Sequence, residues 1–266
     1  MASLRLSLAR AAALAAGLVL AAGSAMADKL VIGSYPANPP WENKKTDGTF
    51  EGFEVDLVTE VAKRLGVELE ISDYDFQALF AATSSGRIDC AISTISITPD
   101  RLKAQSFTQA YYDNDMALAT RADSTVTGLA DMKGKTVGAL ATSVPEAWVK
   151  ANTEKYGFGD YKGYKAFQDL LLEIQNGRID GGVNDAIGLE FAMQRMEGIA
   201  IRERIKTDDQ YALMCRKDHP MLGQINDTIT AMKKDGTMAA LYKKWLGVDA
   251  VEGAATITEL PMPKAE

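Results

Sequence analysis

Hydrophobic and polar positions follow two periods along this chain, one typical of helices and one typical of strands. In residues 52–66 apolar side chains recur every three or four positions, which predicts an amphipathic helix that a glycine ends. The short apolar runs at 29–33 and 67–71 predict buried strands on either side of that helix. Strands that alternate with helices are typical of the α/β class.

One helix–strand unit occurs twice, at a fixed offset of 91 residues. Residues 76–93 and 167–184 align without a gap and share seven of eighteen residues. Each copy predicts a helix, a glycine stop and an apolar strand that ends in small polar residues, at 93–94 and at 184–185. Because ligands of open α/β sheets bind beyond the carboxyl ends of the strands, the repeat predicts two lobes around one cleft.

In this interpretation the chain passes between the two lobes twice. Crossings near 119–123 and 206–211 make a two-strand hinge, which permits closure around a ligand. The last segment contains prolines and lacks periodicity, so we expect a mobile or surface-draped tail. The predicted divisions are residues 28–119 (first lobe), 120–208 (second lobe), 209–248 (first lobe, C-terminal part) and 249–266 (tail).

Residues 1–27 have the pattern of a secretory signal peptide. Two arginines give a basic start, residues 11–22 are apolar, and Ala-Met-Ala at 25–27 is a small-x-small cleavage site. The apolar run is too short to anchor the chain across a bilayer. We therefore expect cleavage after Ala27 and export of the mature chain.

Composition and charge exclude several classes of function. Without residues 1–27, which hold two arginines and no acid, the formal net charge falls from −7 to −9. Nucleic-acid binding needs clusters of Lys and Arg, and the sequence has none. No His-Cys, Ser-His-Asp or metal-ligand spacing is visible, and the single histidine, His219, is expected to be a surface cap at a helix start. We therefore predict no catalytic set, no metal and no cofactor.

The two cysteines, Cys90 and Cys215, each lie in an apolar, strand-like run. An exported protein meets an oxidising compartment that permits a disulfide, but two cysteines give no framework pattern. Two buried free thiols are the simpler interpretation, and a bond between them stays open as the alternative.

Hydroxyl groups and one arginine follow the first repeat strand. Polar and apolar residues alternate over 93–98, so the hydroxyls of Ser93, Thr94 and Ser96 are candidates for one polar wall. Arg101 follows within the first turn of the next predicted helix. A guanidinium group binds a carboxylate through two parallel hydrogen bonds, and hydroxyls complete its shell. An ordinary surface side chain is the alternative for Arg101.

Two further candidates come from the second lobe. Ser143 and Val144 stand at a helix start, where unpaired backbone N–H groups favour an anion, although a simple N-cap serine explains the same pattern. Asp185 ends the second repeat strand and can hold an ammonium group, or it can cap the helix that follows. Hydrogen-bond donors for an anion and one carboxylate for a cation, placed around the same cleft, suit a zwitterionic ligand.

Taken together, these segments resemble a known family, the bacterial periplasmic solute-binding proteins for polar amino acids. Gly-Phe-Glu-Val-Asp-Leu at 52–57 resembles the family signature, and Ile-Ser-Thr-Ile-Ser-Ile-Thr-Pro-Asp-Arg at 92–101 resembles its ligand loop. The resemblance covers residues 28–248. Further matching segments are residues 107–112, 134–138 and 235–247.

The resemblance implies a two-lobed periplasmic-binding-protein fold of type II, a monomer that closes on one L-amino acid. It also implies delivery of that ligand to an inner-membrane ABC permease, without a cofactor and from the periplasm. By the family motif Arg101 binds the α-carboxylate, helped by Thr94 and by the N–H groups of Ser143 and Val144.

By the same motif Ser96 and Asp185 take the α-ammonium, with Ser93 beside them, and Phe76 forms an aromatic wall over the ligand. The sequence departs from the family in one place. An acid and, three residues later, an aromatic residue are common after the first strand, but Tyr35 and Asn38 stand there. These positions line the side-chain pocket in relatives, and the missing acid weakens the case for lysine or arginine. We expect an uncharged polar or acidic amino acid.

Two other functions stay open on the same scaffold. Some relatives are periplasmic cyclohexadienyl dehydratases, which use an acid in the cleft to eliminate water from arogenate or prephenate. The unusual pair of Tyr35 and Asn38 keeps this alternative open. A ligand-sensing module of a receptor is the other alternative.

Overall fold

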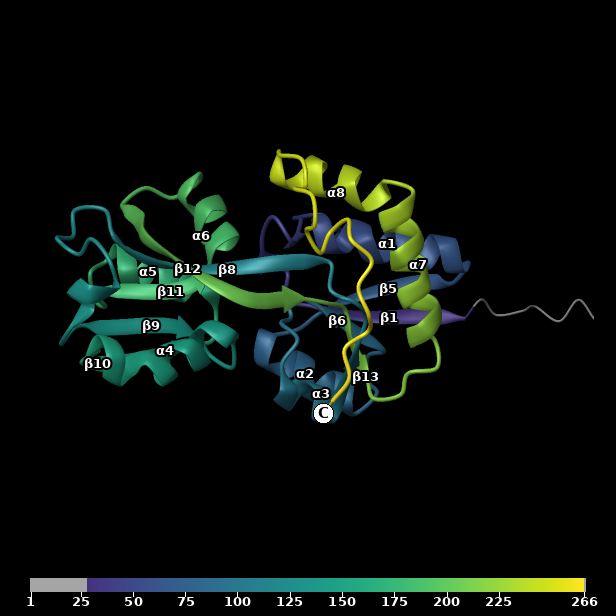
Figure 1. Ribbon diagram of the computed structural model, residues 1–266, viewed down its shortest axis with the longest axis horizontal. Coiled ribbons are helices and arrows are strands. Elements are labelled where there is room, and N and C mark those ends of the chain that lie inside the picture. Colours follow the sequence, from purple (N-terminus) through teal and green to yellow (C-terminus); the bar gives the residue numbers. More distant parts are fainter. Residues whose placement is uncertain (1–27, 266) are drawn as a thin grey trace, which may run out of the picture.

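Two α/β lobes joined by a pair of long strands make up the molecule (Figure 1). The computed structural model describes residues 28–265, so the predicted signal peptide and its cleavage site lie outside the described residues. Each lobe has a central five-stranded sheet with helices packed against it. The predicted α/β class and its two-lobed arrangement are therefore confirmed.

The first lobe is built on a mixed sheet of order β5-β1-β6-β13-β7, in which β1 lies parallel to both β5 and β6. Helices α1, α7 and α8 pack on one face, and α2 and α3 pack on the other. A small antiparallel sheet, β2-β3-β4, follows β1. The elements are β1 (Lys29–Ser34), β2 (Ala37–Asn38), β3 (Glu42–Lys44), β4 (Phe50–Glu51), α1 (Phe53–Leu65), β5 (Glu68–Asp73), α2 (Phe76–Ser84), β6 (Cys90–Ile92), α3 (Pro99–Ala104), β7 (Gln105–Phe107), β13 (Met214–Arg216), α7 (Leu222–Lys234) and α8 (Thr237–Leu246).

The second lobe repeats this plan with a sheet of order β10-β9-β11-β8-β12, in which β9 lies parallel to β10 and β11. Helix α4 packs on one face of this sheet, and α5 and α6 pack on the other. The elements are β8 (Tyr112–Arg121), the 3₁₀ helix η1 (Leu129–Met132), β9 (Thr136–Leu140), α4 (Val144–Tyr156), β10 (Asp160–Tyr164), α5 (Phe167–Gln175), β11 (Gly181–Asp185), α6 (Ala186–Met193) and β12 (Ile199–Tyr211).

The sequence repeat corresponds to α2–β6 in the first lobe and to α5–β11 in the second. The shared Gly-Arg-Ile-Asp has the same role in both copies, because its aspartate accepts a backbone hydrogen bond from a neighbouring parallel strand, β1 in the first lobe and β9 in the second. The N–H of Val31 donates to Asp89 at 2.9 Å, and the N–H of Thr136 donates to Asp180 at 2.8 Å. The repeat therefore reflects a structural unit that was predicted correctly.

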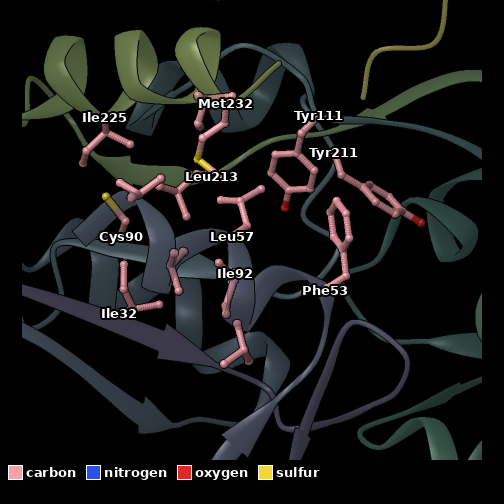
Figure 2. Packing of buried hydrophobic residues seen from close by; sticks show 14 of the residues in the cluster. Ile32, Phe53, Leu57, Cys90, Ile92, Tyr111, Tyr211, Leu213, Ile225 and Met232 are labelled. Atoms are coloured by element: carbon pink, nitrogen blue, oxygen red, sulfur yellow. The ribbon is translucent and has the colours of Figure 1, made fainter. Parts of the chain in front are cut away.

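The core of the first lobe fills the space between its sheet and helices α1 and α7 (Figure 2). Ile32 and Ile92 face Leu57 of α1 and Met232 of α7, and all four side chains are fully buried. Each such side chain contributes about 1.5–3 kcal/mol to folding relative to exposure. Helix α1 ends as predicted at Gly66, which has a φ of 69° and closes the helix in the left-handed conformation.

Cys90 and Cys215 form a disulfide, so the expectation of two free thiols is wrong. The two residues lie directly opposite each other on the antiparallel strands β6 and β13. The bond joins the early part of the first lobe to the part that returns after the second lobe. In the chain-entropy account a loop this long stabilises the fold by about 4–5 kcal/mol.

His219 is also not at the surface. Only 6% of the residue is exposed, and its Nε2 lies 3.1 Å from Oδ1 of Asp89. Its Nδ1 accepts the N–H of Met221, the residue just before α7, at 3.2 Å. Met221 is itself the N-cap of α7, so His219 lies near the helix start as predicted but does not cap it. Within residues 28–265, every helix is too short or too polar to span a bilayer.

The crossing strands β8 and β12 pair antiparallel and run from one lobe to the other (Figure 1). From Met116 to Ala119 strand β8 already pairs with β11 of the second sheet. The first crossing thus lies at about 112–115, before the predicted 119–123, whereas the end of β12 coincides with the predicted 206–211.

The C-terminal segment runs back along the first lobe toward α3 (Figure 1). Ala255 and Thr256 are buried, and the N–H of Ala255 donates to Asp113, at the start of β8, at 2.7 Å. Nζ of Lys233 donates to the carbonyl of Thr258 at 2.8 Å. These contacts hold the segment against the lobe beside one of the crossing strands.

Candidate functional site

A pocket lies between the two lobes, at the carboxyl ends of the parallel strands of both sheets. It encloses about 430 Å³ of space, part of which is open to solvent. All ten residues predicted from the sequence line it, and Leu140, Pro145, Phe167 and Asn184 join them. The predicted lining residues are Tyr35, Asn38, Phe76, Ser93, Thr94, Ser96, Arg101, Ser143, Val144 and Asp185.

Sheet topology explains why the pocket forms here. In the first lobe the chain leaves β1 toward α1 and reaches β6 from α2, and these helices cover opposite faces of the sheet. A crevice therefore opens between the adjacent ends of β1 and β6. The N–H of Tyr35, after β1, donates to the hydroxyl of Ser93, after β6, at 2.8 Å. The second lobe offers the ends of β9 and β11 in the same way.

The backbone is strained at this pocket. Ser93 has a φ of 143° and Thr94 a φ of 49°, and Thr142, whose carbonyl contacts Arg101, has a φ of 64°. A residue other than glycine in such a conformation costs about 1–3 kcal/mol. Glu54 of α1 offsets part of this cost, because both its carboxylate oxygens accept the N–H of Thr94 at 3.1 Å.

A second buried acid, Glu42, supports the pocket residue Asn38. The amide nitrogen of Asn38 donates to Glu42 at 3.2 Å and to the hydroxyl of Thr94 at 3.3 Å. Burial, and then the charge of the neighbouring Glu54, raise the pKa of Glu42 well above its ordinary value. Glu42 therefore keeps its proton at a higher pH than an exposed glutamate does. The two neighbouring acids, Glu42 and Glu54, fix the positions of the pocket residues Asn38 and Thr94 through hydrogen bonds.

Arg101 enters the pocket from the first turn of α3, where its N–H donates to the capping hydroxyl of Thr98 at 3.2 Å. Its Nη1 donates to the carbonyl of Ser96 at 2.8 Å, and its Nη2 donates to the carbonyl of Thr142 at 3.1 Å. Burial lowers its pKa to about 10, so the guanidinium stays charged at neutral pH. Two of its five N–H donors are used on carbonyls, which leaves donors for a carboxylate.

Asp185 reaches the pocket from the end of β11. Its Oδ1 accepts the amide N–H of Asn114 at 3.0 Å, and its side chain makes no capping hydrogen bond to α6. Burial raises its pKa to about 7, and the nearby charge of Asp209 adds to the rise. The alternative role as an N-cap is thus not the one that the structure has.

Ser143 does cap its helix. Its hydroxyl accepts the N–H of Glu146 at 3.2 Å and donates to the carbonyl of Leu140 at 2.6 Å. The backbone of this helix start faces the pocket through Val144, the first residue of α4, whose N–H has no preceding helical turn to bond to.

The two lobes touch across the pocket through a pair of glutamines that are equivalent in the repeat. Gln77 of the first lobe donates to the carbonyl of Ala141 in the second lobe at 3.1 Å. Gln168 of the second lobe donates to the carbonyl of Ala37 in the first lobe at 2.6 Å. The hydroxyl of Tyr35 also donates to Gln168 at 3.1 Å, so the pocket is covered by both lobes.

Sequence reasoning missed several residues of the site. Phe167 has the same place in the second repeat that Phe76 has in the first, so the offset of 91 pointed to it. The bracing acids Glu42 and Glu54, and the Asn114–Asp209 pair behind Asp185, had no local signal, because their partners are distant in the sequence.

Comparison with known proteins gives a consistent result. The family model described as "Bacterial extracellular solute-binding proteins, family 3" matches residues 30–248. The arginine-binding extracellular protein ArtP of Bacillus subtilis is 31% identical over 220 residues, which cover 82% of this chain and 86% of that protein. The L-cystine-binding protein TcyJ of Escherichia coli is 29% identical over 227 residues, which cover 84% of each.

A solved structure gives the same picture in three dimensions. An ancestral arginine-binding protein bound to arginine superposes with a TM-score of 0.78 at 31% identity, covering 84% of this chain and all of that one. The matching family is described as solute-binding proteins, which favours the predicted binding role over the dehydratase alternative. With a model match over more than four-fifths of its length, this chain belongs to family 3 of the bacterial extracellular solute-binding proteins.

Proposed function

We propose that this protein binds one L-α-amino acid between its lobes and delivers it to an inner-membrane ABC permease. One observation carries the proposal: Arg101 of the first lobe and Asp185 of the second line the same pocket, and both are hydrogen-bonded to neutral groups. Charges held away from water are costly unless they are paired. The carboxylate and the ammonium of an amino acid supply the two missing opposite charges.

The other pocket residues add contacts to the α-carboxylate and to the α-ammonium of the ligand. The carboxylate accepts from Arg101, from the hydroxyl of Thr94 and from the N–H at the start of α4, in the region of Ser143 and Val144. The ammonium donates to Asp185 and Ser96, with Ser93 beside them. Phe76 and Phe167, one from each repeat, enclose the ligand between aromatic faces.

For the ligand side chain we propose an uncharged polar group that donates hydrogen bonds. Asp185 is the only acid among the pocket residues in the described part of the chain, and the ammonium occupies it. The amide nitrogen of Asn38 donates its two hydrogen bonds to Glu42 and Thr94. Its amide oxygen can then accept a hydrogen bond from the side chain of the ligand. An acidic side chain finds no second cation there. The names of the relatives make arginine the competing candidate.

We also propose that residues 1–27 are removed after Ala27 and that the mature protein works in the periplasm. The basic, apolar and small-residue regions of this segment support the proposal. Mass spectrometry of the exported protein locates the mature N-terminus.

Calorimetric titration with the twenty L-amino acids tests the proposed function. We expect one or a few of them to bind at micromolar concentration or tighter, with glutamine or asparagine ahead of arginine. At about a hundred times the dissociation constant, the ligand should stabilise the fold by about 2.7 kcal/mol. Silence across the whole panel would contradict the proposal, and a clear preference for arginine would contradict only the choice of side chain.

Replacement of Arg101 separates charge from geometry. Arg101→Ala should weaken binding by about 2–5 kcal/mol, because it leaves the ligand carboxylate buried without a partner. Arg101→Lys keeps the charge and loses the planar fork, so its affinity should lie between those of wild type and Arg101→Ala. Arg178→Ala, at an exposed position of the second repeat, is the control. If Arg101→Ala and Arg178→Ala bind equally well, the assignment of Arg101 is wrong.

Binding should also depend on pH through Asp185. The ammonium binds the carboxylate form, and a group with a pKa of about 7 loses that form as the pH falls. Affinity should therefore drop about 30-fold from pH 8 to pH 5.5. Asp185→Asn should bind weakly with a nearly flat pH profile. A wild-type affinity that is constant or rises toward pH 5.5 would show that Asp185 does not hold the ammonium.

The paired glutamines should stabilise the closed form. Gln77→Ala and Gln168→Ala each remove the hydrogen bonds that one side chain makes between the lobes. Each variant should therefore raise the dissociation constant by at least about 2–10-fold, which corresponds to about 0.5–1.5 kcal/mol for one net hydrogen bond. Gln175→Ala is a matched control, because Gln175 donates to a carbonyl within the second lobe at 2.8 Å. Equal affinities for all three variants would refute a role of these two residues in closure.

A further inference from the structure

Asp209 lies behind the pocket at the end that faces Asp185. It does not line the pocket, yet two polar groups of this end are bonded to it. The hydroxyl of Ser96 donates to Oδ2 of Asp209 at 2.9 Å. The amide nitrogen of Asn114 donates to the same oxygen at 3.0 Å and to Oδ1 of Asp185 at 3.0 Å. One network thus joins Ser96, Asp209, Asn114 and Asp185.

The count of protons in this network decides what it can bind. A serine hydroxyl can donate only one hydrogen bond, and Ser96 donates it to Asp209. On the pocket side the hydroxyl oxygen of Ser96 can therefore only accept a hydrogen bond. The two N–H bonds of the Asn114 amide go to the two acids. This end of the pocket therefore presents hydrogen-bond acceptors to a ligand. A ligand group with several N–H donors can bond to all of them.

Strand geometry brings Asp209 to this place. Strand β12 loses its regular pairing with β8 between Ile205 and Asp209, and pairing resumes with Asp209 opposite Asn114. Thr207 stabilises the irregular stretch, because its hydroxyl donates to the carbonyl of Asn114 and accepts the N–H of Asp209 at 3.1 Å. Such an irregularity changes the direction in which a side chain points. Asn114 lies in β8 and Asp209 in β12. These two strands cross from one lobe to the other (Figure 1).

Five titratable groups lie close together here: Arg101, Asp185, Asp209, Tyr211 and Tyr112, whose ring stacks on that of Tyr211. Burial raises the pKa of Asp209, and its hydrogen bonds with Asn114 and Ser96 oppose that rise. Burial and the two acids raise the pKa of Tyr211 well above its usual value, so the phenol stays neutral. The negative charge of Asp209 therefore raises the pKa of Asp185 and opposes the fall in the pKa of Arg101.

We propose that Asp209 is a positioning residue that makes this protein select ligands with an α-ammonium group. Asp209 accepts the hydroxyl hydrogen bond of Ser96 and, through the amide of Asn114, fixes the position of the Asp185 carboxylate. This end of the pocket therefore presents only hydrogen-bond acceptors. The inference rests on the proposed function and deepens it: the preference for an amine is set partly from the crossing strands, behind the residues that touch the ligand.

The test compares two ligands on two matched variants of the full mature chain. The ligands are the tightest-binding amino acid of the panel and its 2-hydroxy-acid analogue, which has the same carboxylate and side chain but no ammonium. The variants are Asp209→Asn and Asp208→Asn, which remove the same charge from neighbouring positions of β12. Asp208 is exposed and serves as the control.

In wild type and in Asp208→Asn, the amino acid should bind far more tightly than the hydroxy acid. In Asp209→Asn this ratio should fall at least tenfold, with little change in the affinity for the hydroxy acid. The pH midpoint of amino-acid binding should also move down, because the charge of Asp209 helps to raise the pKa of Asp185. A purely structural role for Asp209 does not predict these two changes together.

An unchanged ratio in Asp209→Asn, or an equal loss for both ligands, would overturn the inference. If this variant does not fold, Ser96→Ala deletes the hydroxyl that Asp209 orients, and an unchanged ratio in that variant overturns it equally. Failure of the wild-type protein to bind any amino acid would contradict the proposed function as well. Amino-acid binding with an unaltered ratio in the variants would contradict only the role of Asp209.

Discussion

Two opposite charges that face each other without pairing are the constraint around which this structure is organised. Arg101 and Asp185 come from different lobes and are partly buried, and their hydrogen-bond partners are carbonyl groups and an amide. Burial shifts both pKa values toward the uncharged forms, to about 10 and about 7. In the proposed function, a ligand that carries one charge of each sign pairs with both groups at once, so binding favours the arrangement in which the two lobes meet.

The rest of the architecture positions these two groups. Each sheet presents the carboxyl ends of its parallel strands to the pocket. Arg101, in the first turn of α3 after β6, and Asp185, the last residue of β11, therefore both reach it. The acid pair of Glu42 and Glu54 holds the strained loop that contributes Thr94. The repeat adds an aromatic residue and a glutamine contact from each lobe, so these contacts between the lobes are nearly symmetric while the charges are not.

Much of this could be predicted from the sequence, because it rests on local patterns. The repeat, the glycine that ends α1 and the capped start of α3 depend on neighbouring residues, and the family motif placed the ten lining residues. Contacts that depend on strand order could not be predicted. Cys90 meets Cys215 only because β13 returns beside β6, and Asp209 meets Asn114 only because of an irregular stretch in β12. The burial of His219 against Asp89 has the same origin.

A crystal structure of the protein with its tightest-binding amino acid tests whether Arg101 and Asp185 bind the two ends of the ligand. This role predicts a bidentate contact between the α-carboxylate and the guanidinium of Arg101, and an α-ammonium at about 2.7–3.2 Å from the carboxylate of Asp185. A ligand bound in the opposite orientation, or one that leaves either of these two side chains without contact, would contradict it.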